Sequence, residues 1–159
     1  MNSARPFRAG LVLACLTAAA FAAESEIGVA AAYVRMPPPG ARVSAAFMVL
    51  DNPTGVARKL VRAQSPAAKV VELHTHMVHD GYMQMRKIDS IDIAAGGRVE
   101  LKPGSFHLML IDFRGGKEDE AVPISLFFDD GGSKQISVPL RRDVATPAAA
   151  GMGHGGGRH

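Results

Sequence analysis

The sequence predicts an antiparallel β-sandwich of eight or nine short strands. Short apolar segments recur at spacings near ten residues, and clusters of glycine, proline, asparagine and aspartate separate them. This spacing is typical of two packed antiparallel sheets. No segment after the first 22 residues has a convincing helical periodicity. The chain of 159 residues is long enough for one domain with a hydrophobic core and too short for two.

We expect the first three strands at residues 28–35, 43–51 and 59–63. The first is followed by Pro37-Pro38-Pro39, and prolines cannot donate backbone hydrogen bonds to a sheet. The second ends at the turn residues Asn52 to Gly55. Alanines within both strands favour helix, but the flanking glycine, proline and β-branched residues favour strand. A single short helix at 65–70 stays open.

The next two strands form a hairpin around Asp80-Gly81, a strong two-residue turn signal. With these two residues in the turn, His79 faces Tyr82 and His76 faces Met85 across the pair. His74 is then diagonal to Met85 and on the same face, because side chains alternate along a strand. His74, His76 and Met85 can therefore share one surface.

The remaining segments continue the pattern. Residues 88–93 are expected as a short strand or an extended loop, 98–101 as a strand, and 106–113 as the most hydrophobic strand. Within that strand, His107 and Met109 point to one face and Leu108 to the other. Residues 114–120 form a charged loop. The last two strands, 121–128 and 134–140, flank a hairpin turn at 129–132.

Histidine and methionine crowd into one part of the chain. Residues 74–109 hold four of the six histidines and four of the eight methionines. Imidazole and thioether are neutral side chains that bind soft or borderline metals. Two strand segments, one on the hairpin and one beginning near His107, each supply both donor types. This clustering predicts a copper site.

The spacing of His74, Met85, His107 and Met109 is H-x10-M-x21-H-x-M. This motif resembles the signature of the PCu(A)C family of periplasmic copper chaperones, as do the surrounding Val-Glu-Leu-His and Leu-Lys-Pro-Gly segments. The likeness runs from about residue 28 to 142. One departure is Ser105, where a second glycine is expected after Gly104.

The resemblance implies a cupredoxin-like sandwich that binds one Cu(I) through His74, Met85, His107 and Met109. It also implies delivery of the metal to the copper centre of a respiratory haem-copper oxidase, with a thioredoxin-like copper chaperone as a further partner. We expect the chaperone to be a monomer.

Other histidines and methionines are weaker candidates. His76 and Met83 lie on the predicted site face, as auxiliary ligands or as solvated residues around the site. Residues 143–159 form a glycine-rich tail that has little apolar bulk. It carries Met152, His154 and His159. The tail resembles the His/Met-rich extensions of some members of the family, and this resemblance implies a second copper site, for Cu(II). A tail without function is the alternative.

The first 22 residues read as a signal peptide. Two arginines precede an apolar run, and Ala20-Phe21-Ala22 offers small residues for cleavage after Ala22. The run is too short to span a bilayer. The alternative is a lipoprotein anchored through Cys15, which follows only a short apolar stretch. Removal leaves a periplasmic domain at 23–142 without cysteine, so thioethers replace thiolates that an oxidising compartment would convert to disulfides.

Composition excludes several other classes of protein. Loss of Arg5 and Arg8 with the signal peptide lowers the formal net charge from +3 to +1, which does not favour nucleic acid as a partner. The sequence contains no nucleophile motif, phosphate loop or zinc-protease motif, so we do not expect an enzyme. Two other functions stay open: a copper buffer or resistance protein without a dedicated acceptor, and a structural sandwich whose His/Met cluster is incidental.

Overall fold

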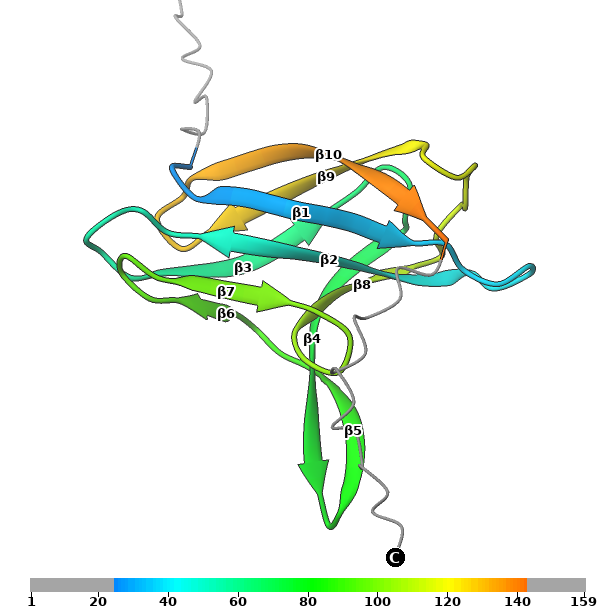
Figure 1. The fold of residues 1–159 in the computed structure, drawn as a ribbon, viewed down its shortest axis with the longest axis horizontal. Coiled ribbons are helices and arrows are strands. Elements are labelled where there is room, and N and C mark those ends of the chain that lie inside the picture. Colours follow the sequence, from blue (N-terminus) through cyan, green and yellow to red (C-terminus); the bar gives the residue numbers. More distant parts are fainter. Residues whose placement is uncertain (1–24, 143–159) are drawn as a thin grey trace, which may run out of the picture.

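The computed structural model describes residues 25–142, and all regular secondary structure in that range is β-strand (Figure 1). The predicted signal peptide and the predicted tail lie outside the described residues. The described part contains no helix that could cross a membrane. The strands are β1 (Gly28–Arg35), β2 (Val43–Asp51), β3 (Arg58–Gln64), β4 (Val70–His79), β5 (Tyr82–Lys87), β6 (Ile91–Ile93), β7 (Arg98–Leu101), β8 (His107–Ile111), β9 (Ala121–Phe128) and β10 (Ser133–Arg141).

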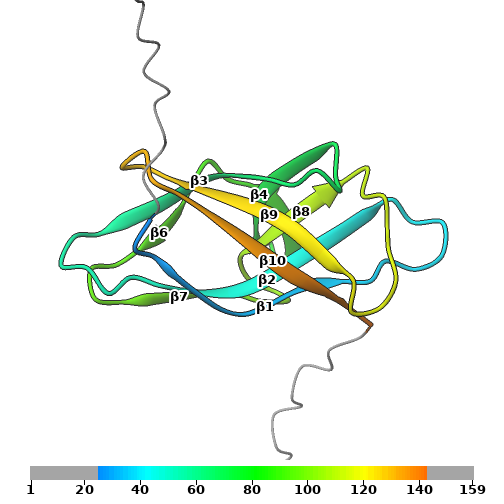
Figure 2. The same ribbon diagram turned by 90° about the horizontal axis from the view of Figure 1, so that it is seen from above.

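The strands form two layers that enclose one core (Figure 2). The first layer has the order β5-β4-β8-β2-β1, with β7 also paired to β2, and the second has the order β10-β9-β3-β6. The ladder between β1 and β10 joins the layers and is parallel, whereas every other ladder is antiparallel. The predicted sandwich is therefore confirmed, with one parallel pair between strands that are far apart in sequence.

The predicted ranges 28–35, 43–51, 98–101 and 121–128 coincide with β1, β2, β7 and β9. Two expectations need correction. The described chain has ten strands instead of eight or nine, because Ile91–Ile93 pairs with β3 as a strand of its own. The strand expected at 106–113 spans only His107–Ile111.

Residues 65–70, where the sequence left a short helix open, do not form a helix. The Ser65 hydroxyl donates to the Pro123 carbonyl at 2.7 Å and accepts from the Ala67 amide at 3.2 Å. These bonds hold a turn against β9, and serine side chains of this kind compete with helical hydrogen bonding. The tertiary contact to Pro123 thus decides the local conformation.

Alternation along β4 and β8 separates the core from the outer face of the first layer. Leu73 of β4 and Leu108 and Leu110 of β8 are buried in the core. Histidine and methionine occupy the intervening positions, so they lie on the outer face. The same register that packs the core therefore gathers the candidate ligands on one surface.

Candidate metal centre

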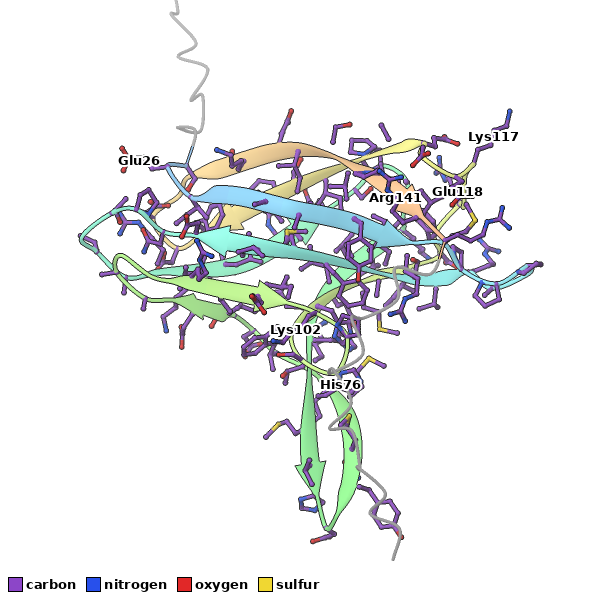
Figure 3. The ribbon with its side chains drawn as sticks, in the orientation of Figure 1. Glu26, His76, Lys102, Lys117, Glu118 and Arg141 are labelled. Atoms are coloured by element: carbon purple, nitrogen blue, oxygen red, sulfur yellow. The ribbon has the colours of Figure 1, made fainter. Side chains whose placement is uncertain are left out.

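The hairpin of β4 and β5 extends beyond the body of the sandwich, and at its base β4 pairs side by side with the start of β8 (Figure 1). Asp80 and Gly81 both have positive φ, 51° and 79°, as a type I′ turn requires. The register then places His76 opposite Met85, as predicted, and His74 opposite His107. In Figure 3 the labelled His76 lies at the base of the hairpin, near the loop that carries Lys102.

His107 and Met85 are in direct contact. The Nε2 atom of His107 lies 3.2 Å from the Sδ atom of Met85. The Nδ1–H of His107 donates to the Ser105 carbonyl at 3.0 Å, and since a carbonyl can only accept, the proton is assigned to Nδ1. The Nε2 lone pair therefore faces a thioether sulfur, which also offers lone pairs. Two soft donors that converge in this way can share a Cu(I) ion.

Only one of the two ring nitrogens of His74 has a hydrogen-bond partner. Its Nε2 lies 2.9 Å from Oε2 of Glu72, and its Nδ1 is buried without a hydrogen-bond partner. The ring centroids of His74 and His107 are 5.7 Å apart. A buried nitrogen with no partner is uncommon in proteins and calls for an explanation such as a ligand.

Met109 and His76 lie on the same outer face. Met109 is half-buried and pairs with Glu72 and with Ala45 across its two neighbouring strands. The His76 ring lies 5.2 Å from the His107 ring, and its Nδ1 is 3.4 Å from the Ser105 carbonyl. His76 therefore lies close to His107, although the sequence made it only a weaker candidate ligand.

Met83 lies further out on the hairpin than these residues. It pairs with Val78, one pair of site-face residues closer to the turn than His76 and Met85, and the residue is 65% exposed. The expected auxiliary residues Met152, His154 and His159 lie outside the described residues. Within residues 25–142, no group of three or more histidine, cysteine, aspartate or glutamate side chains is arranged to hold a metal ion.

The surroundings of His107 favour its neutral form. Burial lowers the pKa of His107 below the ordinary value of 6.5, while the hydrogen bond to Ser105 acts in the opposite direction. Neighbouring positive charge, including that of Arg35, lowers the pKa further. Arg35 reaches this position by stacking on Phe47, whose ring centroid is 6.2 Å from that of His107. A neutral imidazole is the form that binds metal.

The lowered pKa of His107 predicts a pH-dependent stability in the metal-free protein. As pH falls through about 6.5, the unfolded chain takes up the proton before the folded chain, so the free energy of unfolding decreases. We expect His107→Gln to lose less stability than wild type between about pH 7.5 and 5.5, either side of the ordinary imidazole pKa, in urea denaturation. His79→Gln, at a side chain 64% exposed, is the control and should follow wild type. Equal losses in His107→Gln and wild type would contradict a buried, neutral His107.

The loop before β8 is built around Gly104 and Ser105. Gly104 has φ of +79°, which glycine adopts readily, and the Ser105 amide donates to the Lys102 carbonyl at 3.0 Å. The left-handed position falls on Gly104, so the turn does not need glycine at position 105. The Ser105 carbonyl in turn fixes the His107 ring.

Sequence reasoning gave no role to Glu72 or to the Ser105 carbonyl. Glu72 is two residues before His74, so strand alternation alone places it on the site face. Its carboxylate also accepts from Lys87 at 2.8 Å, and the hydrogen bonds from Lys87 and His74 lower its pKa below the ordinary 4.5. The Ser105 carbonyl could not be found from sequence, because a backbone group carries no residue signal.

The fold is that of a cupredoxin-like domain of the PCuAC type, as the resemblance implied. The chain belongs to the LpqE-like family, whose model, described as putative lipoprotein LpqE-like, matches residues 27–140.

Two curated relatives are similar over about 100 residues. One is the putative lipoprotein Lxx21020 of Leifsonia xyli, 30% identical over 104 residues. The other is the uncharacterized protein RP573 of Rickettsia prowazekii, 31% identical over 105 residues. The matches include 64% and 63% of this chain, and they span 63% and 56% of the relatives, which is less than two thirds of their length.

Solved structures with the same fold include copper-binding domains. The copper-bound PCuAC domain from PmoF2 aligns with a TM-score of 0.64 at 20% identity, over 76% of this chain and 97% of that domain. The Cu(I) form of DR1885 from Deinococcus radiodurans aligns with a TM-score of 0.58 at 29% identity, over 73% of this chain and 78% of that protein. Apo-DR1885 aligns at 27% identity and a TM-score of 0.59, over 91% of this chain and 98% of that protein.

Proposed function

We propose that this protein is an exported copper chaperone that binds one Cu(I) through His74, Met85, His107 and Met109. The observation that carries the proposal is the contact between the His107 Nε2 lone pair and the Met85 sulfur at 3.2 Å. Two acceptors have no proton to share, so a soft cation between them satisfies both. The 29% identity to a protein solved in a Cu(I) form supports the same metal.

The donor chemistry suits a carrier better than an enzyme. Two imidazoles and two thioethers fill the coordination shell of Cu(I), so no open position is left for a substrate. Thioethers are neutral and carry no negative charge to hold the cation, unlike thiolates. Met85, which is 46% exposed, is the donor that an incoming acceptor can reach first. Release by ligand exchange at this exposed thioether is the transfer step that we propose.

The acceptor we propose is the copper centre of a respiratory haem-copper oxidase, with a thioredoxin-like copper chaperone as a further partner. A copper buffer or resistance protein is the second candidate. The site of a buffer would have the same donors. The two functions therefore differ in the cellular process that needs the protein: oxidase activity for a chaperone, and copper tolerance for a buffer. Both candidates are copper-binding functions, and neither has nucleic acid as a partner.

An anaerobic titration against a chromophoric Cu(I) chelator tests the binding part of the proposal. We expect the purified protein to take one equivalent of Cu(I) from the chelator, because one set of four donors is available in the described domain. A second, weaker equivalent would point to the tail. If the protein takes up no Cu(I), both the chaperone function and the buffer function are rejected. The remaining interpretation is a structural sandwich whose His/Met cluster is incidental.

A deletion strain then separates the chaperone from the buffer. Loss of oxidase activity that added copper restores is expected for a chaperone. Loss of copper tolerance with normal oxidase activity would instead identify a buffer or resistance protein.

The form in which the protein is exported is also a proposal. Cleavage after Ala22 gives a periplasmic chain without cysteine, with the domain at 23–142 and the tail at 143–159. The family description as a putative lipoprotein favours the alternative, in which Cys15 carries the lipid. The mass of the exported chain decides between them, because a lipid-modified chain begins at Cys15 and a lipid-free chain begins near residue 23.

A further inference from the structure

We infer that Glu72 is a positioning residue that fixes the tautomer of His74 and leaves Nδ1 as its metal-binding nitrogen. The inference rests on the proposed copper site and names the atom that each histidine would use. Glu72 is not part of the four-residue spacing motif. Its role follows from the hydrogen bonds of three side chains on the outer face of β4 and β5.

The carboxylate of Glu72 is held from two sides. Its Oε1 accepts from Nζ of Lys87 at 2.8 Å, and its Oε2 lies 2.9 Å from Nε2 of His74. Lys87 is directly opposite His74 in the β4–β5 register, and Glu72 is two residues before His74 on the same face of β4. With one oxygen assigned to each partner, the carboxylate has little freedom to turn away from His74.

The partner atom determines which nitrogen of His74 carries the proton. A carboxylate only accepts hydrogen bonds, so Nε2 of a neutral His74 must be the protonated nitrogen. The lone pair is then on Nδ1, which is buried and has no hydrogen-bond partner. Leaving a buried acceptor unpaired costs free energy, and a bound cation would recover that cost.

His107 has the opposite arrangement. Its Nδ1–H donates to the Ser105 carbonyl, and its Nε2 faces the Met85 sulfur. The two imidazoles would therefore bind one ion through different nitrogens, Nδ1 of His74 and Nε2 of His107. In each ring, the nitrogen that does not bind metal donates to a fixed oxygen, an arrangement that orients metal-binding histidines in general.

The test begins with the tautomers of the metal-free protein. Long-range ¹⁵N–¹H correlation spectra of histidine-labelled protein report which ring nitrogen carries the proton. We expect wild-type His74 to be protonated at Nε2 and the Glu72→Ala variant to lose this preference. The Glu72→Gln variant should retain it, because its amide oxygen still accepts from Nε2–H. Wild-type His74 protonated at Nδ1 would overturn the inference.

Cu(I) binding provides the second readout. One equivalent of Cu(I) should shift the Nδ1 resonance of His74, and Glu72→Ala should lower the affinity by roughly 10-fold to 100-fold, as loss of a histidine-orienting group typically does. Glu100→Ala is the matched control, because Glu100 forms a similar exposed pair with Lys102 at 3.0 Å and lies on β7, away from the row of histidines on β4. We expect its affinity to equal that of wild type.

The outcomes separate this inference from the proposed function. Tight Cu(I) binding with the shift on Nε2 of His74 would overturn the role of Glu72 and leave the chaperone intact. A Cu(I) affinity of Glu72→Ala equal to that of wild type would also overturn the role of Glu72 and leave the proposed chaperone function intact. A protein that takes up no Cu(I) would overturn the proposed function, and the donor assignment with it.

Discussion

Met85→Ala and Met109→Ala are each expected to weaken Cu(I) binding by more than about 100-fold. That loss exceeds the 10-fold to 100-fold effect of removing a group that only supports a ligand. The reason is that each substitution removes one of the two thioether donors of the proposed ligand set. Met85 contacts the His107 imidazole, and Met109 lies on the same face of β8, two residues along the strand. Competition titration under anaerobic conditions measures both affinities.

Met77→Ala is the matched control for these two variants. Met77 lies on the same hairpin and is 52% exposed, but strand alternation turns it to the opposite face from His76. Its affinity should equal that of wild type. Met83→Ala, on the site face but further from His107, should lose no more than about 10-fold, the lower end of what a supporting group contributes. Cu(I) binding that survives both Met85→Ala and Met109→Ala would reject the proposed ligand set.

Leu108→Ala is expected to give the largest loss of stability that we predict, about 2–5 kcal/mol in the free energy of unfolding. Leu108 is fully buried between two candidate ligands, on the central strand β8 of the first layer. The truncation would leave a cavity that two packed sheets cannot easily close. Urea denaturation of the metal-free protein measures the change. Since domains of this size have only about 5–15 kcal/mol of stability in total, the variant is expected near the limit of folding.

Met109→Ala provides the comparison, because it truncates the next residue on the other face of the same strand. Met109 is half-buried, so its loss should cost clearly less stability than that of Leu108. Similar losses for the two variants would contradict the alternation that separates core from site along β8. The comparison also checks that Met109→Ala stays folded in the titrations described above.

Much of the fold is readable from sequence because the determining signals are local. The strands at 28–35, 43–51, 98–101 and 121–128 are bounded by proline, glycine or acidic turn residues, and the structure has the same limits. Asp80-Gly81 sets the register of β4 and β5, because both residues readily adopt the positive φ of the turn. His76 is therefore opposite Met85 in both the prediction and the structure.

Long-range contacts decided the features that sequence reasoning missed. The Ser65 side chain bonds to Pro123, which is 58 residues away, and this contact replaces the short helix that stayed open at 65–70. The parallel pairing of the end of β1 with the end of β10 joins strands about 100 residues apart, and no local pattern encodes it. The same holds for the pairing of His74 with His107, which depends on β4 and β8 lying side by side.

The sequence by itself determined the donor types, their spacing and the alternation that puts them on one face of each strand. These properties depend on residue identity and on the period of a strand, and both are local. Only the tertiary structure decided which atoms face one another: Nε2 of His107 against the Met85 sulfur, and Nε2 of His74 against Glu72. The first contact joins residues on β8 and β5, so it depends on how the hairpin and β8 are packed. The second joins neighbours on one face of β4; alternation allows it, and the structure shows which ring nitrogen takes part.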